Sequence, residues 1–240
     1  MLKNQERNDI FVLQEKIQNA KDTKTFKFKP INKKILHFIP GQYVTLYFLE
    51  DEFGWQGKSY SIMSSPSDDF WEITVKKNGQ FSEKIHNLKI GDKVKIMGPE
   101  GYFYPNSKIE KLVFLAGGVG ITPFYSIIKN EISNKLDKKV ITLFYGNKTK
   151  KDIVFLDELK KMSKNNKKLK IIHCISRELK NYGREYERGR ISIKIIKKYI
   201  KNFSENQYFI CGSISFVNEL WHTLKRDGIQ EKNIFTEAFY

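Results

Sequence analysis

The chain has 240 residues, of which 40% are hydrophobic and 29% are charged, and its formal net charge is +16. This length suits two domains of about 100 to 150 residues each, and the composition excludes a disordered or collagen-like chain. Two cysteines are too few for a disulfide scaffold, or for an iron–sulfur or zinc site that takes four protein thiolates.

The positive charge is concentrated in the second half of the chain. Residues 1–106 hold 16 Lys and Arg against 13 Asp and Glu, a net charge of +3, whereas residues 107–240 hold 27 against 14, a net charge of +13. Such a charge suits nucleic acid, anionic lipid or an acidic protein partner. The lysine runs alternate with Asn and Ile, however, so we interpret most of them as a solvated face.

The amino-terminal segment, residues 1–16, is charged throughout and lacks the apolar core of a secretory signal. This pattern predicts a cytoplasmic protein. The longest uncharged stretch, residues 112–128, contains three glycines and Pro123 and is too short to cross a bilayer comfortably. We therefore expect no membrane span.

Residues 1–106 are predicted to form an antiparallel β-barrel or sandwich. The β-type runs are residues 25–28, 43–48, 71–76 and 93–97. Turn dipeptides such as Asn78-Gly79 separate them. Strands that follow one another about every ten residues are typical of these architectures.

The pattern changes after residue 106, and we predict a second, α/β domain over residues 107–240. Its apolar runs are residues 112–115, 140–145, 169–175, 208–210 and 233–235. Stretches of helical period lie between them, at residues 123–132, 153–162, 192–200 and 215–226. Five strands with four intervening helices indicate a parallel sheet that has helices on both faces.

Two segments offer backbone N–H groups to a phosphate. The strand at 112–115 runs into a glycine-rich turn, residues 117–120, and Pro123 suits the start of the helix that follows. A second predicted helix opens at residues 79–82 and adds the Ser82 hydroxyl. Two such sites indicate two phosphorylated ligands or one long dinucleotide, although a tight turn without a ligand is the plain alternative for the first.

Taken in order, the motifs resemble those of the ferredoxin–NADP reductase family, and the resemblance covers nearly the whole chain. The matching segments are PGQY (40–43), KSYS (58–61), GQFS (79–82), GPEG (98–101), GGVGITP (117–123), YGN (145–147), CGS (211–213) and EAFY (237–240). The resemblance implies a flavin-binding antiparallel β-barrel followed by a nicotinamide-nucleotide domain. The implied cofactor is FAD, with FMN as the alternative, because the adenine end of the flavin site is poorly specified.

The resemblance also implies residue roles at the flavin. Lys58 stands where the family has an arginine on the flavin pyrophosphate, Tyr60 packs on the ring and ribityl chain, and Ser61 lies near flavin N5. A compact ammonium cannot make the bidentate grip of a guanidinium, so we expect weaker and more exchangeable flavin. The further flavin-binding residues that the resemblance implies are Ser59, Thr74, Val75, Lys76, Gly79, Gln80, Phe81 and Ser82.

Three residues far apart in the sequence match the family's groups around the reacting atoms. Ser61 would bond near N5, Cys211 would pack on the nicotinamide, and Glu237 would help to relay a proton. An aromatic residue at the end of the chain, Phe239 or Tyr240, would stack on the flavin and move aside for the nicotinamide. A buried structural thiol and a simple carboxyl-terminal anchor are the plain alternatives for Cys211 and for the aromatic residue.

The coenzyme preference depends on the adenosine 2′-phosphate. Ser176 and Arg177 follow the third predicted strand of the second domain, and Arg184 and Tyr186 come soon after. In family members that prefer NADPH, such residues bind the 2′-phosphate and stack on adenine. We therefore favour NADPH over NADH. The alternative is that the arginines belong to a solvated loop. The further coenzyme-binding residues implied are Gly117, Gly118, Gly120, Thr122, Pro123 and Gly212.

The implied function is a flavin-dependent NAD(P)H oxidoreductase that passes electrons to a separate acceptor, such as an acidic ferredoxin or flavodoxin. One alternative is an NAD(P)H:free flavin reductase. Another is a non-catalytic basic module that binds nucleic acid or a protein, although no nucleic-acid motif is present and we expect no nucleic-acid partner. The four histidines show no metal-ligand spacing, so no metal site is expected.

Overall fold

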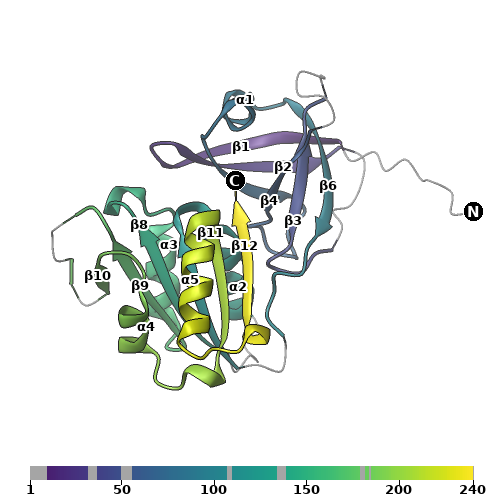
Figure 1. Ribbon diagram of the computed structural model, residues 1–240. Coiled ribbons are helices and arrows are strands. Elements are labelled where there is room, and N and C mark those ends of the chain that lie inside the picture. The colour runs from purple at the N-terminus through teal and green to yellow at the C-terminus, as the bar shows by residue number, and fades with distance from the viewer. Residues whose placement is uncertain are drawn as a thin grey trace, which may run out of the picture.

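The computed structural model describes residues 10–31, 37–49, 56–106, 110–133, 139–178, 182–183 and 185–239. Two six-stranded sheets follow one another along the chain and form its two halves (Figure 1). Among these residues, no helix is long and apolar enough to cross a membrane.

The first half is an antiparallel sheet with one helix. Its elements are β1 (Ile10–Ala20), β2 (Thr23–Pro30), β3 (Tyr43–Tyr47), β4 (Lys58–Ser61), β5 (Trp71–Lys76), α1 (Gln80–Asn87) and β6 (Lys93–Glu100). The strands are hydrogen-bonded in the order β4-β3-β6-β1-β2-β5. The outer strands also meet, because Met63 N, just after β4, donates to Glu72 O of β5 over 2.8 Å. The sheet therefore curls on itself, as a barrel requires.

The second half is a parallel sheet whose strands alternate with helices. Its elements are β7 (Lys111–Gly117), α2 (Thr122–Ser133), β8 (Val140–Asn147), α3 (Leu156–Asn165), β9 (Leu169–Ile175), β10 (Tyr186–Arg188), α4 (Ile193–Tyr199), β11 (Gln207–Ser213), α5 (Ile214–Arg226) and β12 (Ile234–Phe239). Short 3₁₀ helices are η2 (Gly118–Ile121), η3 (Lys150–Asp152), η4 (Phe203–Glu205) and η5 (Glu231–Asn233). The strand order is β10-β9-β8-β7-β11-β12, and every pair is parallel.

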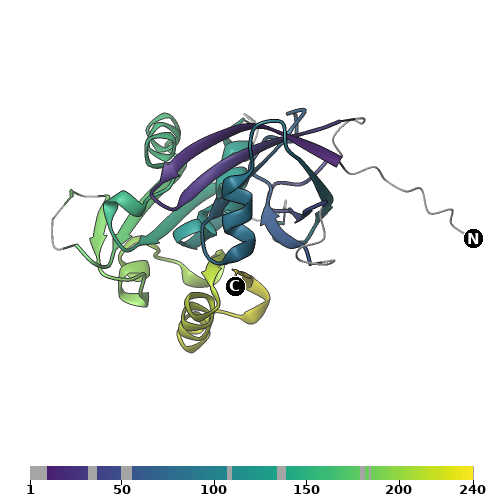
Figure 2. The same cartoon turned by 90° about the horizontal axis from the view of Figure 1, so that it is seen from above.

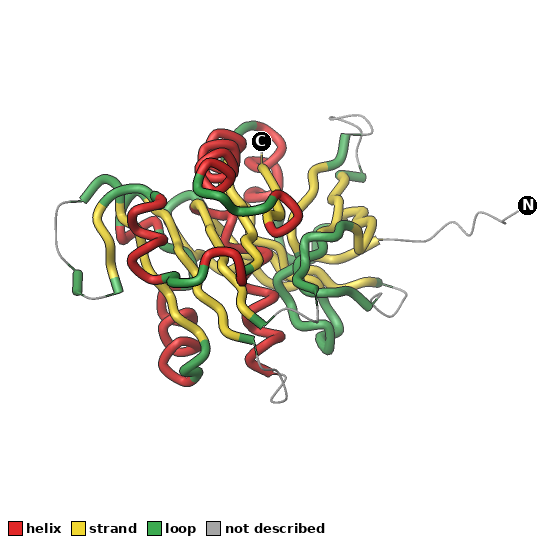
Figure 3. Tube along the Cα trace, turned by 60° about the horizontal axis from the view of Figure 1, so that its bottom comes forward, coloured by secondary structure: helices red, strands yellow, loops and turns green. Residues whose placement is uncertain are grey.

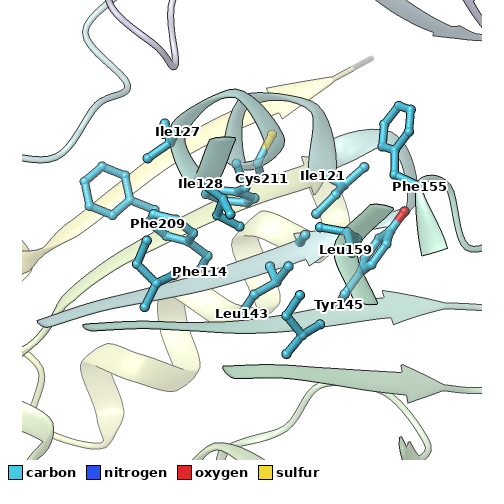
Figure 4. Packing of buried hydrophobic residues seen from close by; sticks show 14 of the residues in the cluster. Phe114, Ile121, Ile127, Ile128, Leu143, Tyr145, Phe155, Leu159, Phe209 and Cys211 are labelled. Carbon is cyan, nitrogen blue, oxygen red and sulfur yellow. The ribbon is translucent and has the colours of Figure 1, made fainter. Parts of the chain in front are cut away.

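Helices cover both faces of the parallel sheet, as Figure 3 shows. Successive side chains of a strand point to opposite faces. Phe114 of β7 accordingly packs in one buried cluster with Ile127 of α2 and Leu159 of α3 (Figure 4). Its neighbours Val113 and Leu115 belong to the other cluster, which α4 and α5 cover. This two-sided burial explains why the central strand β7 is apolar from Leu112 to Ala116.

The two halves pack directly against each other. Met63 and Phe103 of the first half belong to the same buried cluster as Phe124 of α2, and the ring centroids of Phe103 and Phe124 are 5.6 Å apart. Burying a large apolar side chain contributes about 1.5–3 kcal/mol. Apolar packing therefore holds the halves together at this seam.

The fold class predicted from the sequence is confirmed, an antiparallel sheet followed by a parallel α/β sheet. The predicted strands at Trp71–Lys76 and Leu169–Ile175 have the observed bounds. The sequence patterns did not single out β1, whose outer part is polar, or β10, which has three residues. The domain boundary predicted after residue 106 adjoins residues 107–109, which lie outside the described residues, and stays a prediction.

Candidate functional site at the seam of the two halves

A cavity of about 360 Å³ opens at the carboxyl ends of the parallel strands. It lies where the strand order reverses, because β7 has β8 on one side and β11, a later strand, on the other. Ligands of open α/β sheets bind at such switch points. Gly117, Gly146, Ser176 and Ser213, at or just after the ends of β7, β8, β9 and β11, all line the cavity.

Two glycines of the turn after β7 are required for different physical reasons. Gly118 has a φ of +54°, and a Cβ there would meet nothing within 4 Å, so this residue leaves its side of the cavity open. A Cβ at Gly120 would lie 2.2 Å from the Cys211 carbonyl oxygen. Gly120 therefore permits close packing on β11, while Gly118 begins a helical segment whose first N–H groups suit a phosphate.

Thr122 and Pro123 complete this turn from inside the protein. Both are buried, and Thr122 Oγ1 donates to Val119 O over 3.0 Å. Pro123 occupies the first turn of α2, where a backbone N–H would have no acceptor within the helix, so its absence costs no hydrogen bond. These two residues shape the turn, and the cavity is lined by Gly117, Gly118 and Val119 instead.

Phe216, in the first turn of α5, lies over the ends of β7 and β11. A Cβ at Gly212 would lie 2.7 Å from the Phe216 ring, and a Cβ at Gly117 would lie 3.2 Å from it. Phe216 also lines the cavity. Both glycines are therefore needed to seat an aromatic side chain at the cavity wall.

Ser176 and Arg177 follow β9 and reach the same cavity as Gly118. Arg177 N donates to Lys148 O over 2.8 Å, and Ser176 Oγ donates to Asn147 O over 3.3 Å. These bonds fix the backbone and leave the Arg177 side chain exposed. The structure thus brings the glycine-rich turn and the predicted Ser-Arg pair together.

Tyr186 lies outside the cavity, on the edge strand β10. Its ring stacks on His173, with centroids 5.1 Å apart, and its buried hydroxyl has no hydrogen-bond partner among the described residues. Burial lowers the pKa of His173 to about 4, so this imidazole is a neutral core residue. The adenine-stacking role of Tyr186 stays a prediction, and Arg184 lies outside the described residues.

The predicted anion site at the start of α1 uses backbone groups only. Gly79 precedes the helix with a φ of +88°, and Gln80 at the helix start is exposed. The Ser82 hydroxyl accepts from Asn78 N over 2.7 Å and donates to Gly79 O over 2.9 Å. Because Ser82 is occupied within the turn and Phe81 is buried in the barrel core, the first N–H groups of α1 are what this segment offers.

The KSYS element forms β4, and its side chains divide by position. Lys58 and Ser59 are exposed, and the Ser59 hydroxyl lies 3.1 Å from that of Thr45 on β3. Tyr60 packs against the barrel core, and burial raises the pKa of its hydroxyl. Lys58 therefore has the freedom to meet an anion from solvent, while Tyr60 has a fixed ring.

Three of the predicted flavin-binding residues, Thr74, Val75 and Lys76, end β5. The Thr74 hydroxyl lies 2.6 Å from that of Thr25 and donates to Met63 Sδ over 2.8 Å, and Val75 is part of the barrel core. The side chains of Thr74 and Val75 therefore make their contacts within the first half. Lys76 differs, because it is exposed and lines the cavity at the sheet of the second half.

A row of polar side chains crosses the seam between the halves. Ser61 on β4 pairs in register with Tyr43 on β3, and Cys211 on β11 pairs with Glu237 on β12. The Glu237 charge acts on both the Tyr43 hydroxyl and the Cys211 thiol. The register thus places Ser61 beside Tyr43 and Cys211 beside Glu237, and the Glu237 carboxylate is near enough to Tyr43 to raise the pKa of its hydroxyl. That the three predicted residues surround one reacting centre stays a prediction.

Burial controls the protonation of this row. It raises the pKa of Glu237 to about 7 and raises that of Cys211 well above its ordinary value, with a further contribution from Glu237. Burial, and then the nearby Glu100 and Glu237 carboxylates, raise the pKa of Tyr43. Cys211 is consequently a neutral thiol, whereas Glu237 exchanges its proton close to neutral pH.

The residues at the seam fit a flavin. Ser61 Oγ and Glu237 Oε2 are buried and have no hydrogen-bond partner among the described residues. A buried polar atom without a partner costs about 1–3 kcal/mol, and the polar edge of an isoalloxazine ring would supply partners. The backbone N–H groups at the start of α1 suit the pyrophosphate of FAD.

Phe239 continues β12 after Glu237. It pairs in register with Ser213 and packs against the buried cluster of the second half. Its ring is only partly buried, so a neighbour in a flavin site is compatible with its position. Tyr240 lies outside the described residues, and the choice between these two aromatic residues stays open.

Tyr43 and Phe216 had no role predicted from the sequence. Tyr43 follows Pro40, Gly41 and Gln42 at the start of a strand, and this motif is the signal that could have marked it. Phe216 comes four residues after Gly212, and an aromatic at the start of a helix that follows a glycine is a weak signal. The positions of both residues at the site are evident only once the structure gives the strand register and the packing.

Comparisons with known proteins agree with this geometry. Residues 10–104 match the oxidoreductase FAD-binding domain, and residues 114–220 match the oxidoreductase NAD-binding domain. Flavohemoprotein A of Dictyostelium discoideum is 31% identical over 95% of this chain, and the glycine betaine monooxygenase reductase subunit of Pseudomonas aeruginosa is 32% identical over 93%. The chain spans 59% and 62% of the lengths of these two relatives.

Solved structures agree on the fold. The flavohem-like FAD/NAD-binding domain of nitric oxide dioxygenase from Vibrio cholerae superposes with a TM-score of 0.84 at 23% identity, over 97% of this chain and 98% of that one. The two matched domains stand in the same order as the two sheets and cover β1 to β11 apart from the first three residues of β7. The chain therefore belongs to the ferredoxin–NADP reductase-like family of FAD- and NAD(P)-binding oxidoreductases.

Proposed function

We propose that this chain is an FAD-dependent oxidoreductase that oxidises NADPH and passes electrons to a separate acceptor protein. The observation that carries the proposal is the row at the seam, where two buried polar atoms, Ser61 Oγ and Glu237 Oε2, lack partners. When bound, FAD would accept a hydride from the nicotinamide and release its electrons singly. The protein's task is then to align two rings and to exclude water.

The residues of the seam support distinct tasks. Ser61 would hold the edge of the isoalloxazine ring by a hydrogen bond. Cys211, a neutral and buried thiol, would give the nicotinamide an apolar surface. Glu237, whose pKa is raised to about 7 by burial, would hold or release a proton at neutral pH, as a group does best when its pKa lies near the working pH.

NADPH is the proposed coenzyme because of Arg177. Its side chain is exposed at the rim of the cavity that the glycine-rich turn lines, and a guanidinium binds a phosphate through paired charge-assisted hydrogen bonds. Arg177→Ala should raise the KM for NADPH about tenfold, a loss of about 1.4 kcal/mol, and that for NADH less than twofold. Arg188→Ala, an exposed control on β10 that does not line the cavity, should leave both unchanged.

Equal effects of Arg177→Ala on both coenzymes would remove the preference for NADPH and leave the reductase proposal intact. Steady-state measurements with each coenzyme at several concentrations separate these outcomes. For each coenzyme, the KM of Arg177→Ala is divided by the KM of the unmodified protein. The proposal is supported if this ratio is at least fivefold larger for NADPH than for NADH.

The proposed acceptor is an acidic one-electron carrier such as a ferredoxin or flavodoxin. The given sequence holds two cysteines, too few for an iron–sulfur cluster bound by four of its own thiolates. One relative is named as the reductase subunit of a monooxygenase. The net charge of +13 in residues 107–240 would speed encounter with an acidic partner. The rate with such a carrier should fall steeply as salt rises.

A reductase that supplies free flavin is the second candidate, and Lys58 favours it. The family's arginine is replaced by an exposed lysine, which binds a pyrophosphate less firmly. Purified protein with substoichiometric FAD, and a faster rate with added flavin than with a carrier protein, would select this candidate. Lys58→Arg should then tighten flavin binding.

A further inference from the structure

The hairpin between β1 and β2 extends beyond the core of its own half. The buried part of β1 ends at Leu13, yet the strand continues for seven residues to Ala20. Figures 1 and 2 show the hairpin reaching from the first half toward the carboxyl end of β8. Its last strand residue, Ala20, packs against the buried cluster of the second half.

The tip of this hairpin is held in one conformation. The Gln18 side-chain amide donates to the carbonyl oxygens of Lys21 and Thr23, each over 3.3 Å. Lys77 N donates to Asp22 O over 2.7 Å. The two turn residues thus have occupied carbonyls and exposed side chains, so the side chains are free to meet a ligand from a fixed backbone.

The hairpin tip forms part of the cavity that the glycine-rich turn lines. Residues 20–23 line it from the first half, together with Lys76, and Gly118 and Arg177 line it from the second half. Lys21, Lys76, Lys148 and Arg177 line this one cavity, and none of the four forms an ion pair with a described residue. Three acidic residues line it as well: Glu219 pairs with Arg190, Asp152 accepts from the Thr149 hydroxyl, and Asp22 lies beside Lys21. Unpaired cations from both halves around one cavity suit a ligand with several phosphate charges.

We propose that the β1–β2 hairpin is a second wall of the coenzyme site and that Lys21 binds a phosphate of the dinucleotide from across the seam. This inference rests on the proposed function, since it takes the cavity as the NADPH site. The bound coenzyme would then contact both halves, and its binding would stabilise their association. A phosphate of the pyrophosphate bridge and the 2′-phosphate are the two sources of the charge that Lys21 would meet.

The test is equilibrium binding of NADP⁺ and NAD⁺, measured by titration calorimetry on the FAD-loaded protein. Lys21→Gln should weaken NADP⁺ binding about fivefold, as expected for the loss of one charge-assisted contact at a partly exposed site. Lys21→Arg should restore most of the affinity. Lys24→Gln, which removes a cation three residues farther along the hairpin and outside the cavity, should change the affinity less than twofold.

Comparing the NADP⁺ and NAD⁺ titrations shows which of the two phosphates Lys21 binds. Equal weakening of NADP⁺ and NAD⁺ assigns Lys21 to the pyrophosphate, and weakening of NADP⁺ alone assigns it to the 2′-phosphate. An unchanged affinity for both in Lys21→Gln overturns the inference and leaves the proposed function standing. If the unmodified protein binds neither coenzyme, the proposed function itself is wrong. An unaltered melting temperature without coenzyme verifies that the variants fold.

Discussion

Replacing Glu237 by glutamine should stabilise the protein much more at alkaline pH than at acidic pH. The carboxyl is buried at the seam with an unpartnered Oε2, and burial raises its pKa from 4.5 to about 7. A carboxyl whose pKa is higher in the folded than in the unfolded state favours folding only while it is protonated. Stability is therefore lost as the pH rises from 4.5 through about 7.

The magnitude follows from the same values. A difference of one pKa unit corresponds to about 1.4 kcal/mol, so the rise from 4.5 to about 7 corresponds to about 3 kcal/mol of lost stability above neutral pH. Glutamine has nearly the same shape and carries no charge at any pH. Glu237→Gln should therefore gain about 3 kcal/mol at pH 8, or a melting temperature higher by about 6–12 °C for a chain of this size.

The assay is urea unfolding of the flavin-free protein at pH 5 and pH 8. At pH 5 the unfolded carboxyl is already mostly ionised, so Glu237→Gln should gain about 1 kcal/mol there, a third of the gain at pH 8. Glu231→Gln is the matched control, because this carboxylate is exposed and paired with Lys225 over 2.9 Å. It should change the free energy of unfolding by less than about 1 kcal/mol at either pH. A gain in Glu237→Gln of equal size at both pH values, or a loss at pH 8, would refute the burial argument.

Three further substitutions test the site residue by residue. Gly120→Ala should lower the free energy of unfolding by about 3 kcal/mol in urea titrations, because its Cβ would lie 2.2 Å from the Cys211 carbonyl oxygen; an unchanged midpoint would contradict that packing. Gly118→Ala, with open space but a φ of +54°, should cost only about 1–2 kcal/mol and should weaken NADP⁺ binding in calorimetry. Ser61→Ala should leave the stability of the flavin-free protein unchanged or higher by about 1 kcal/mol, while its FAD dissociation constant rises; a fall in flavin-free stability would show that Ser61 Oγ has a protein partner.

The α/β half was the more predictable from sequence because its strands are buried on both faces. β9 is an apolar run interrupted by Lys170 and His173, and all its residues except Lys170 are buried. β10 was not predictable, because three residues on a sheet edge leave no period to detect. β1 was not predicted for another reason: its outer part is mostly polar and exposed, and Ala20 at its end packs on the buried cluster of the other half.

The site was predictable where motifs fix the backbone and less so where side chains meet across the seam. The glycine-rich turn and the Ser176-Arg177 pair lie at strand ends, so the topology alone brings them together. Tyr43 and Phe216 gain their positions from register and from packing on glycines, which no local pattern reveals. Ser82 was predicted to offer its hydroxyl to an anion, but that hydroxyl already makes two hydrogen bonds within the local turn.

The central claim is that the seam holds a flavin in position to receive a hydride from the nicotinamide coenzyme. The most direct measurement is an anaerobic titration of the FAD-loaded protein with NADPH, followed by the visible absorbance of the flavin. We predict that FAD binds with a stoichiometry of one per chain and that one equivalent of NADPH bleaches its absorbance. A protein that binds no FAD, or whose bound FAD keeps its colour with both NADPH and NADH, would contradict the account.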